Sequence, residues 1–321
     1  MATTVKAVAY VHTSDVDPTV EKAGGDAWEA LVNRCVKSAQ DALDTPPAGY
    51  TPTQRNSLTD LFTSMKATHR GIRLLLRLGD TKPESLDALV LARLQLEGLY
   101  NVCLLTEGAQ YVDRFVHEAW KRQYVHYLLY REETKRLDRF VNFGAEELSR
   151  LLKLAAIWNV TEGQRLTVEY HQLGITPPPG FTPQAIENFP TPGRVIRLIP
   201  VGPKRKMLER LYPEYQELCA YAHGRPVAGF GKTVLDDRSP TRALFGEPNV
   251  HKIFEQQVQA ATQVYSVLSV AQSAVELMAL YPNDMEIVKS AADAWSEIHD
   301  SHILASAIWN IRTKGFFGVV G

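Results

Sequence analysis

The sequence predicts an all-α fold: a multi-helix bundle with a proline-rich crossover loop and little or no sheet. Apolar residues recur at helical intervals along most of the chain. Strand-like runs are few: Val5–Val11, Val195–Pro200 and the terminal GFFGVVG. Seven prolines fall within residues 174–202, which favours an extended crossover over a core element.

The first two helices are predicted at Asp26–Leu43 and Thr53–Leu78. Asp26 suits an N-cap, and Gly79 suits the C-cap of the second helix. A third helix is predicted to open at Pro83 and to run to Glu107. It is apolar on nearly all sides, which predicts a central position.

Helical spacing continues in five further stretches: 110–140, 144–158, 204–222, 249–280 and 283–312. We expect a single helical domain over 1–321. The crossover at 174–202 lies within it, and 281–321 forms a C-terminal helix and tail.

Composition excludes several classes. Hydrophobic residues make up 45% of the chain, charged residues 22%, and the formal net charge is -1. That balance gives no global attraction to nucleic acid or to an anionic membrane. Cys35, Cys103 and Cys219 form no CxxC pair. No signal peptide and no apolar run of about 18 residues is present, so we expect a cytoplasmic protein without membrane contact. We also expect no cofactor.

The GFGKT stretch ending at Thr233 looks like part of a phosphate-binding loop. A Walker A loop requires glycine at 226, where this chain has Pro226. Proline removes a backbone N–H that such a loop uses, and no strand is predicted before it. The stretch is therefore interpreted as a glycine-rich loop leaving a helix end.

Polar residues line one side of the third helix. Arg93, Glu97 and Asn101 are spaced i, i+4, i+8 among leucines and valines. If this helix is central, Arg93 and Glu97 are at least partly buried and require partners, because an unpaired buried charge is very costly. The alternative is that this line is the single solvated face of the helix.

A second polar line ends the helix at 204–222. Tyr212, Tyr215, Cys219 and His223 have gaps of three, four and four, so they share one face. A histidine at a helix C-terminus is stabilised when charged. Together with Arg93 and Glu97, this line would form a polar pocket. Taken alone, it is better explained by core tyrosines and a capping histidine.

Three segments resemble a family of bacterial all-helical proteins classed as a domain of unknown function. They are ARLQLEGLYNVCLL, YPEYQELCAYAHG and VHKIFEQQVQAATQVYSVLSVAQSAVELM, and the resemblance covers about residues 55–280. It implies that Arg93, Glu97, Tyr215 and His223 are the recurrent polar positions. The family often has serine at the position of Cys219, which argues against thiol chemistry there.

The family distantly resembles the HEPN helical bundles, several of which are ribonucleases with an Arg-x(4–6)-His motif. This chain contains such a spacing at Arg165 and His171. The residue after the arginine is Leu166, where the HEPN pattern has a polar residue. His223 has no arginine at that distance, since the nearest upstream one is Arg210.

The sequence carries partial signals for two further kinds of site, a metal site and a nucleic-acid site. His299 and His302 are spaced as a ligand pair, but matching carboxylate helices of a di-iron bundle are absent, so no metal is expected. Basic residues cluster within 121–139 and within 194–210, which would suit an RNA backbone. Interleaved acids such as Glu132 and Asp138 favour a solvated face instead.

The leading hypothesis is a binding or regulatory protein whose pocket, lined by Arg93, Glu97, Tyr215 and His223, takes a nucleotide or RNA. One alternative is a metal-independent ribonuclease with His223 or His171 as general acid/base. Another is an interaction scaffold that forms a homodimer through the helices at 249–312.

Overall fold

The computed structural model describes residues 18–78, 84–134, 141–222 and 249–284, together with 286, 289 and 293. All regular structure in these residues is helical, as the sequence predicts. The helices are α1 (Pro18–Ala42), α2 (Pro52–Leu78), α3 (Glu84–Leu105), α4 (Ala109–Thr134), α5 (Val141–Ile157), α6 (Glu162–Leu173), α7 (Pro192–Leu198), α8 (Pro203–Ala222) and α11 (Asn249–Met278).

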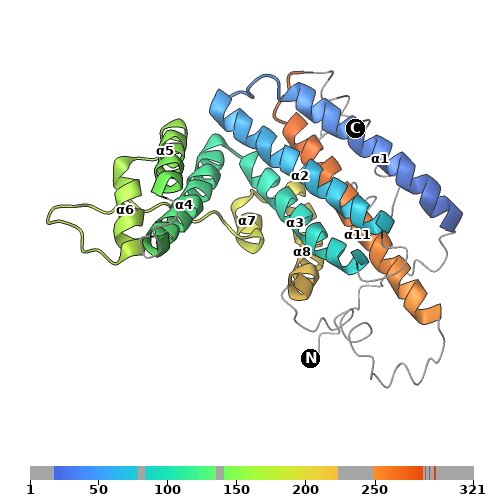
Figure 1. Cartoon of the computed structure of the whole chain (residues 1–321). Coiled ribbons are helices and arrows are strands. Elements are labelled where there is room, and N and C mark those ends of the chain that lie inside the picture. Colours follow the sequence, from blue (N-terminus) through green and yellow to red (C-terminus); the bar gives the residue numbers. More distant parts are fainter. Residues whose placement is uncertain are drawn as a thin grey trace, which may run out of the picture.

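The helices form a main bundle and a lateral arm (Figure 1). The bundle contains α1, α2, α3, α8 and α11, and the short α7 lies at its edge beside α3 and α8. Helix α4 leaves the bundle, and α5 and α6 pack against it to make the arm. The proline-rich crossover then returns from α6 to α7.

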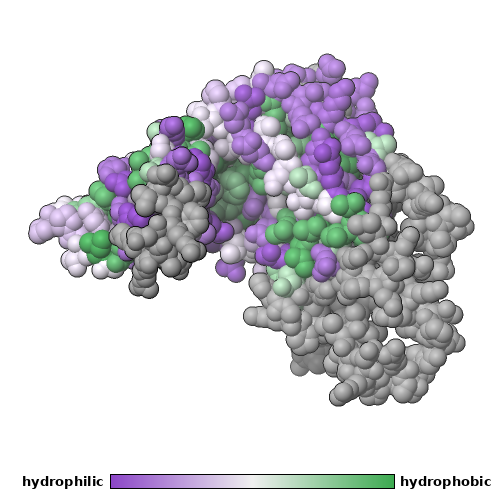
Figure 2. All heavy atoms as spheres, viewed as in Figure 1, coloured by the Kyte–Doolittle hydropathy of each residue, from purple (hydrophilic) through white to green (hydrophobic). Residues whose placement is uncertain are grey.

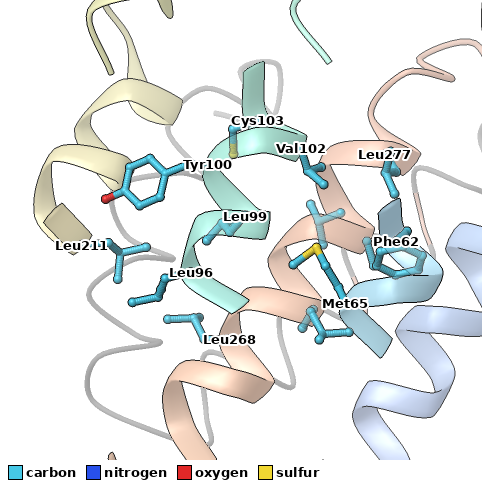
Figure 3. Packing of buried hydrophobic residues seen from close by; sticks show 14 of the residues in the cluster. Phe62, Met65, Leu96, Leu99, Tyr100, Val102, Cys103, Leu211, Leu268 and Leu277 are labelled. Carbon is cyan, nitrogen blue, oxygen red and sulfur yellow. The ribbon is translucent and has the colours of Figure 1, made fainter. Parts of the chain in front are cut away.

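Helix α3 is central, as its apolar composition predicts. It packs against α2, α4, α7, α8 and α11. Figure 3 shows Leu96, Leu99 and Tyr100 of this helix pointing toward side chains of the surrounding helices. At Gly98 a β-carbon would stand 2.9 Å from Met65 of α2, so glycine permits the close approach of these two helices.

Helix α11 carries polar residues into the bundle. From Thr262 to Met278 every side chain except two is buried. Six polar members are fully buried: Thr262, Ser266, Ser269, Gln272, Ser273 and Glu276. A helix that is buried on all sides must satisfy such groups inside the protein.

The arm has a core of its own, formed by Trp120, Tyr124, Leu128, Leu151 and other buried side chains of α4, α5 and α6. Trp120 stacks on Tyr124 with ring centroids 4.8 Å apart, and its indole N–H donates to the Leu151 carbonyl at 2.8 Å. The aromatic ladder on α4 therefore holds α5 against it.

Three sequence-based predictions need correction. Helix α1 begins at Pro18, so Asp26 lies within it and is not the N-cap. Helix α6 was not predicted, and α7 lies inside the stretch interpreted as an extended crossover. The strand-like run from Val195 is the last turn of α7 followed by two non-helical residues.

Several predicted features lie outside the described residues: Val5–Val11, Gly79, Pro83, the glycine-rich loop at 224–233, the terminal GFFGVVG and most of 283–312.

The sequence predicted no apolar stretch long enough to span a membrane, but one described helix has the length and hydropathy of such a span. It is the Asp87–Leu105 part of α3, and 67% of its most apolar window is buried inside the protein. Such burial is typical of the core helix of a soluble protein. The fold is therefore consistent with solubility.

Candidate functional site

The structure brings Arg93 and Glu97 together on α3. Arg93 Nη2 lies 3.1 Å from Glu97 Oε2, and the two side chains are 21% and 35% exposed. Arg93 is therefore largely withdrawn from water, while Glu97 remains accessible. The pair is partly buried and mutually paired, as expected for a central helix, and it lies at the boundary between core and solvent.

Helix α8 supplies the remaining described members of this site. Arg93 Nε donates to Cys219 Sγ at 3.2 Å, and Nη2 lies 3.5 Å from the Tyr215 hydroxyl. The Arg93 guanidinium carbon also lies 5.8 Å from the centre of the Tyr215 ring, within cation–π range. Three of the four predicted residues thus meet, and the fourth, His223, lies outside the described residues.

Tyr215 is held by its neighbours. Its side chain is 8% exposed, and its ring lies 5.7 Å from Tyr100 and 6.2 Å from Tyr212. The Tyr100 hydroxyl donates to the Leu208 carbonyl at 2.7 Å. Burial raises the pKa of Tyr215, so its hydroxyl stays protonated at neutral pH.

Helix α7 reaches the same cluster through Gly193. A β-carbon at Gly193 would stand 2.6 Å from the Tyr212 hydroxyl. The absence of a side chain therefore lets Tyr212 lie against α7. The predicted site thus rests on three helices, because α3 carries Arg93, α8 carries the tyrosines and α7 closes one side.

One edge of the Arg93 guanidinium makes no hydrogen bond with the described residues. The contacts of Arg93 with described residues use Nε and Nη2 and leave Nη1 without a hydrogen bond among them. Leu94, the next residue, is 44% exposed. Figure 2 shows hydrophobic surface over the part of the bundle where α3 faces the viewer. The site therefore combines a positioned cation, an acceptor carboxylate and adjacent apolar surface.

The alternative pair, Arg165 and His171, lies on α6 in the arm. Arg165 is occupied by two carboxylates: Nη2 lies 2.5 Å from Glu162, and Nη1 lies 2.9 Å from Glu169. Nη1 also donates to the Tyr124 hydroxyl at 3.1 Å. His171 is exposed at the end of α6. These contacts give Arg165 a structural role that ties α6 to α4.

A buried ion cluster at the other end of α3 was not anticipated. Lys204 Nζ lies 2.5 Å from Glu107, 3.1 Å from the Thr106 hydroxyl and 3.2 Å from Glu276. Burial lowers the pKa of Lys204, but the negative charges of Glu276 and Glu107 raise it by more than burial lowers it. The net pKa is above the usual lysine value, so the amine stays charged. Gln272 donates to Glu276 at 2.7 Å. This cluster joins α3, α8 and α11.

The sequence contained one signal for this cluster. Glu276 is the only charged residue between Val258 and Leu280. A lone acid in an apolar helix implies a cationic partner inside the fold. Its identity required the tertiary structure, because Lys204 is far away in sequence.

The crossover is fixed to α4 by a row of side chains. Glu118, which is 7% exposed, accepts the backbone N–H of Phe189. Arg114 donates to the Asn188 carbonyl at 2.6 Å, and Lys121 lies 3.0 Å from the Asn188 side chain. A groove of about 400 Å³ lies beside this row, lined by Gln110, Asp113, Arg114, His117, Gln164 and Glu187 among others.

Some members of the two basic clusters make internal contacts. Arg122 pairs with Glu118 at 2.6 Å, and Arg205 pairs with Glu209 at 2.9 Å. Lys204 is part of the buried ion cluster. No group of three or more His, Cys, Asp or Glu within the described ranges is arranged to hold a metal ion. His299 and His302 lie outside those ranges.

Comparisons with known proteins add no assignment. No protein-family model matches the chain, and searches of curated proteins and of solved structures find no similar protein.

Proposed function

We propose that this chain is a helical binding or regulatory protein whose ligand site is formed by Arg93, Glu97, Tyr215 and Cys219. The observation that carries the proposal is the state of Arg93. It is 21% exposed, is oriented by contacts with two helices, and keeps Nη1 free of described partners. A fixed guanidinium at a half-open site suits a phosphate-bearing ligand, such as a nucleotide or RNA.

The surroundings of Arg93 support the same ligand class. Glu97 can accept a hydrogen bond from a hydroxyl or amino group, because its carboxylate is 35% exposed. The exposed Leu94 offers an apolar surface for a ring or base. Such a mixture of few polar groups and apolar surface is typical of small-molecule sites.

The test is a thermal-shift series with nucleoside mono-, di- and triphosphates and with single-stranded RNA. A ligand that binds only the folded chain raises its melting temperature, and at 100 times its Kd it adds about 2.7 kcal/mol. Arg93→Gln should abolish the shift.

Arg205→Gln is the matched control, because Arg205 also pairs with a glutamate four residues later on its helix. It should keep the shift. Absence of any shift with wild-type protein, or equal shifts in Arg93→Gln and Arg205→Gln, would remove the proposal.

The ribonuclease alternative rests on Arg93 with His223, or on Arg165 with His171. It predicts cleavage of single-stranded RNA that His223→Ala or His171→Ala abolishes without unfolding the protein. The binding proposal predicts a shift with intact RNA or nucleotide that persists in both histidine variants.

The scaffold alternative assigns a dimer interface to 249–312. In the described part of that range, most side chains of Thr262–Met278 are buried inside the bundle against α1, α2 and α3. Sedimentation at several concentrations tests this alternative directly, because a homodimer would appear as a concentration-dependent increase in the sedimentation coefficient.

A further inference from the structure

The crossover presents an uncharged, proline-rich stretch to solvent. All residues from Gly174 to Gly180 are exposed, and Ile175 is 49% exposed. No charged residue occurs from Gln172 to Ile186, although 22% of the chain is charged. Solvation alone favours charged and polar residues in an exposed loop, so this composition requires another explanation.

Proline residues restrict the backbone of this stretch. Thr176, Pro177 and Pro178 each precede a proline, which confines them to the extended or polyproline II region. The Phe181 N–H then donates to the Pro178 carbonyl at 3.1 Å, and Gly180 has φ +85°. Proline followed by glycine at these positions forms a type II turn. A short polyproline II ridge therefore ends in a rigid turn.

Both ends of the ridge are attached to α6. Gly174 is the left-handed C-cap of α6, and the Ile175 N–H donates to the Tyr170 carbonyl at 3.0 Å. Phe181 packs edge-to-face on Tyr170 at 5.1 Å. The Gln184 N–H donates to the Thr167 hydroxyl at 2.8 Å. The loop that projects beyond α6 in Figure 1 is thus held in place from both sides.

We propose that Ile175–Phe181 is a docking ridge for a partner protein with an aromatic-lined groove that recognises polyproline II. Such grooves are lined by aromatic side chains that pack against the proline rings of a preformed polyproline II segment. The ridge loses little conformational entropy on binding, because its dihedral angles are already fixed. It lies on the arm, whereas the proposed ligand site is formed by α3 and α8, so the two proposals are independent.

The test uses the full chain and three isolated ¹⁵N-labelled domains that recognise polyproline II: an SH3, a WW and an EVH1 domain. Chemical-shift titration should show saturable binding of at least one domain through its aromatic groove. Pro178→Ala should weaken that binding tenfold or more. Pro200→Ala, which changes an exposed proline outside the ridge, should leave the Kd within twofold.

The alternative role for the prolines is that of a rigid spacer between α6 and α7. A spacer predicts no binding to any of the three domains, or binding that Pro178→Ala leaves unchanged, and either result overturns the proposal. Circular dichroism on both variants establishes that they are folded. Pro178 is exposed, so its replacement should leave the helical signal intact.

Discussion

At the scale of single residues, His69 links the stability of the bundle to pH. Its side chain is 5% exposed and its Nδ1 lies 2.7 Å from the Ser266 hydroxyl, while Nε2 is buried without a hydrogen-bond partner in the part of the chain that the structure describes. Burial lowers the pKa of His69 from 6.5 to about 4. The positive charges of Arg73 and Arg70 act in the same direction, and the negative charge of Glu29 acts in the opposite one. The folded protein therefore holds this histidine neutral.

The sign of the effect follows from proton binding. Between pH 6.5 and pH 4 the unfolded chain binds a proton at His69 that the folded chain does not, so stability falls as pH falls through this window. The loss amounts to about 3 kcal/mol at pH 4. Denaturant unfolding at several pH values should show that His69→Gln removes this part of the slope. The exposed His126→Gln should keep it; equal slopes in the two variants would contradict the assignment.

Lys204 is the second residue whose replacement has a large expected effect. Its ammonium group neutralises Glu276, which is fully buried. Lys204→Met leaves that carboxylate without its lysine and should cost about 3 kcal/mol of unfolding free energy. Arg205→Met removes an exposed helical ion pair next to it and should cost under about 0.5 kcal/mol. Urea denaturation measures the unfolding free energy of both variants. Similar losses would mean that the buried ion cluster stabilises the fold no more than an exposed ion pair does.

At the scale of helices, the contact between α2 and α3 depends on Gly98. Gly98→Ala gains about 1 kcal/mol in helix propensity, but its β-carbon meets Met65 at 2.9 Å in a filled core. We expect a net destabilisation of about 1 kcal/mol. In a Met65→Ala background the same change should be neutral or stabilising, because the space is free. A double-mutant cycle measures this coupling, and additive effects would show that the helices simply move apart.

The two helices that the sequence analysis missed carried readable end signals. Thr161 and Gln164 form a reciprocal capping box at the start of α6, and Gly174 caps its end. Pro192 opens α7 at its first turn. Proline content obscured α7, which lies inside the stretch interpreted as a crossover. Helix α6 contains no proline, but it has only 12 residues and one buried position, Val168, so apolar spacing gave little signal for it. Apolar spacing sufficed for the long helices, whose buried faces repeat over several turns.

The candidate site was predictable only in part. Helical spacing placed Arg93 beside Glu97, and Tyr215 beside Cys219, because such pairs lie one turn apart. The hypothesis of one polar pocket assumed that the two helices meet. Periodicity could not give the contact between Arg93 and Cys219, the approach of Gly193 to Tyr212, or the ion cluster at Lys204. These depend on tertiary packing between residues distant in sequence.

At the scale of the whole molecule, the separate cores of bundle and arm predict two levels of stability. Helices α3 and α11 are surrounded by other helices, whereas α5 packs mainly on α4. In native-state hydrogen exchange, the amides of α3 and α11 should therefore be the most strongly protected. The amides of α5 and α6 should exchange through a local unfolding that costs less free energy. Equal protection in all of these helices would show that arm and bundle unfold as one unit.

The central position of α3 also has a consequence for synthesis on the ribosome. Its main neighbour α11 begins at Asn249, more than a hundred residues after α3 ends at Leu105. A nascent chain therefore emerges with its most apolar helix uncovered and must wait for translation of α11 before that surface is enclosed. Nascent chains stalled before residue 249 should bind chaperones, and those released after α11 has cleared the exit tunnel should not.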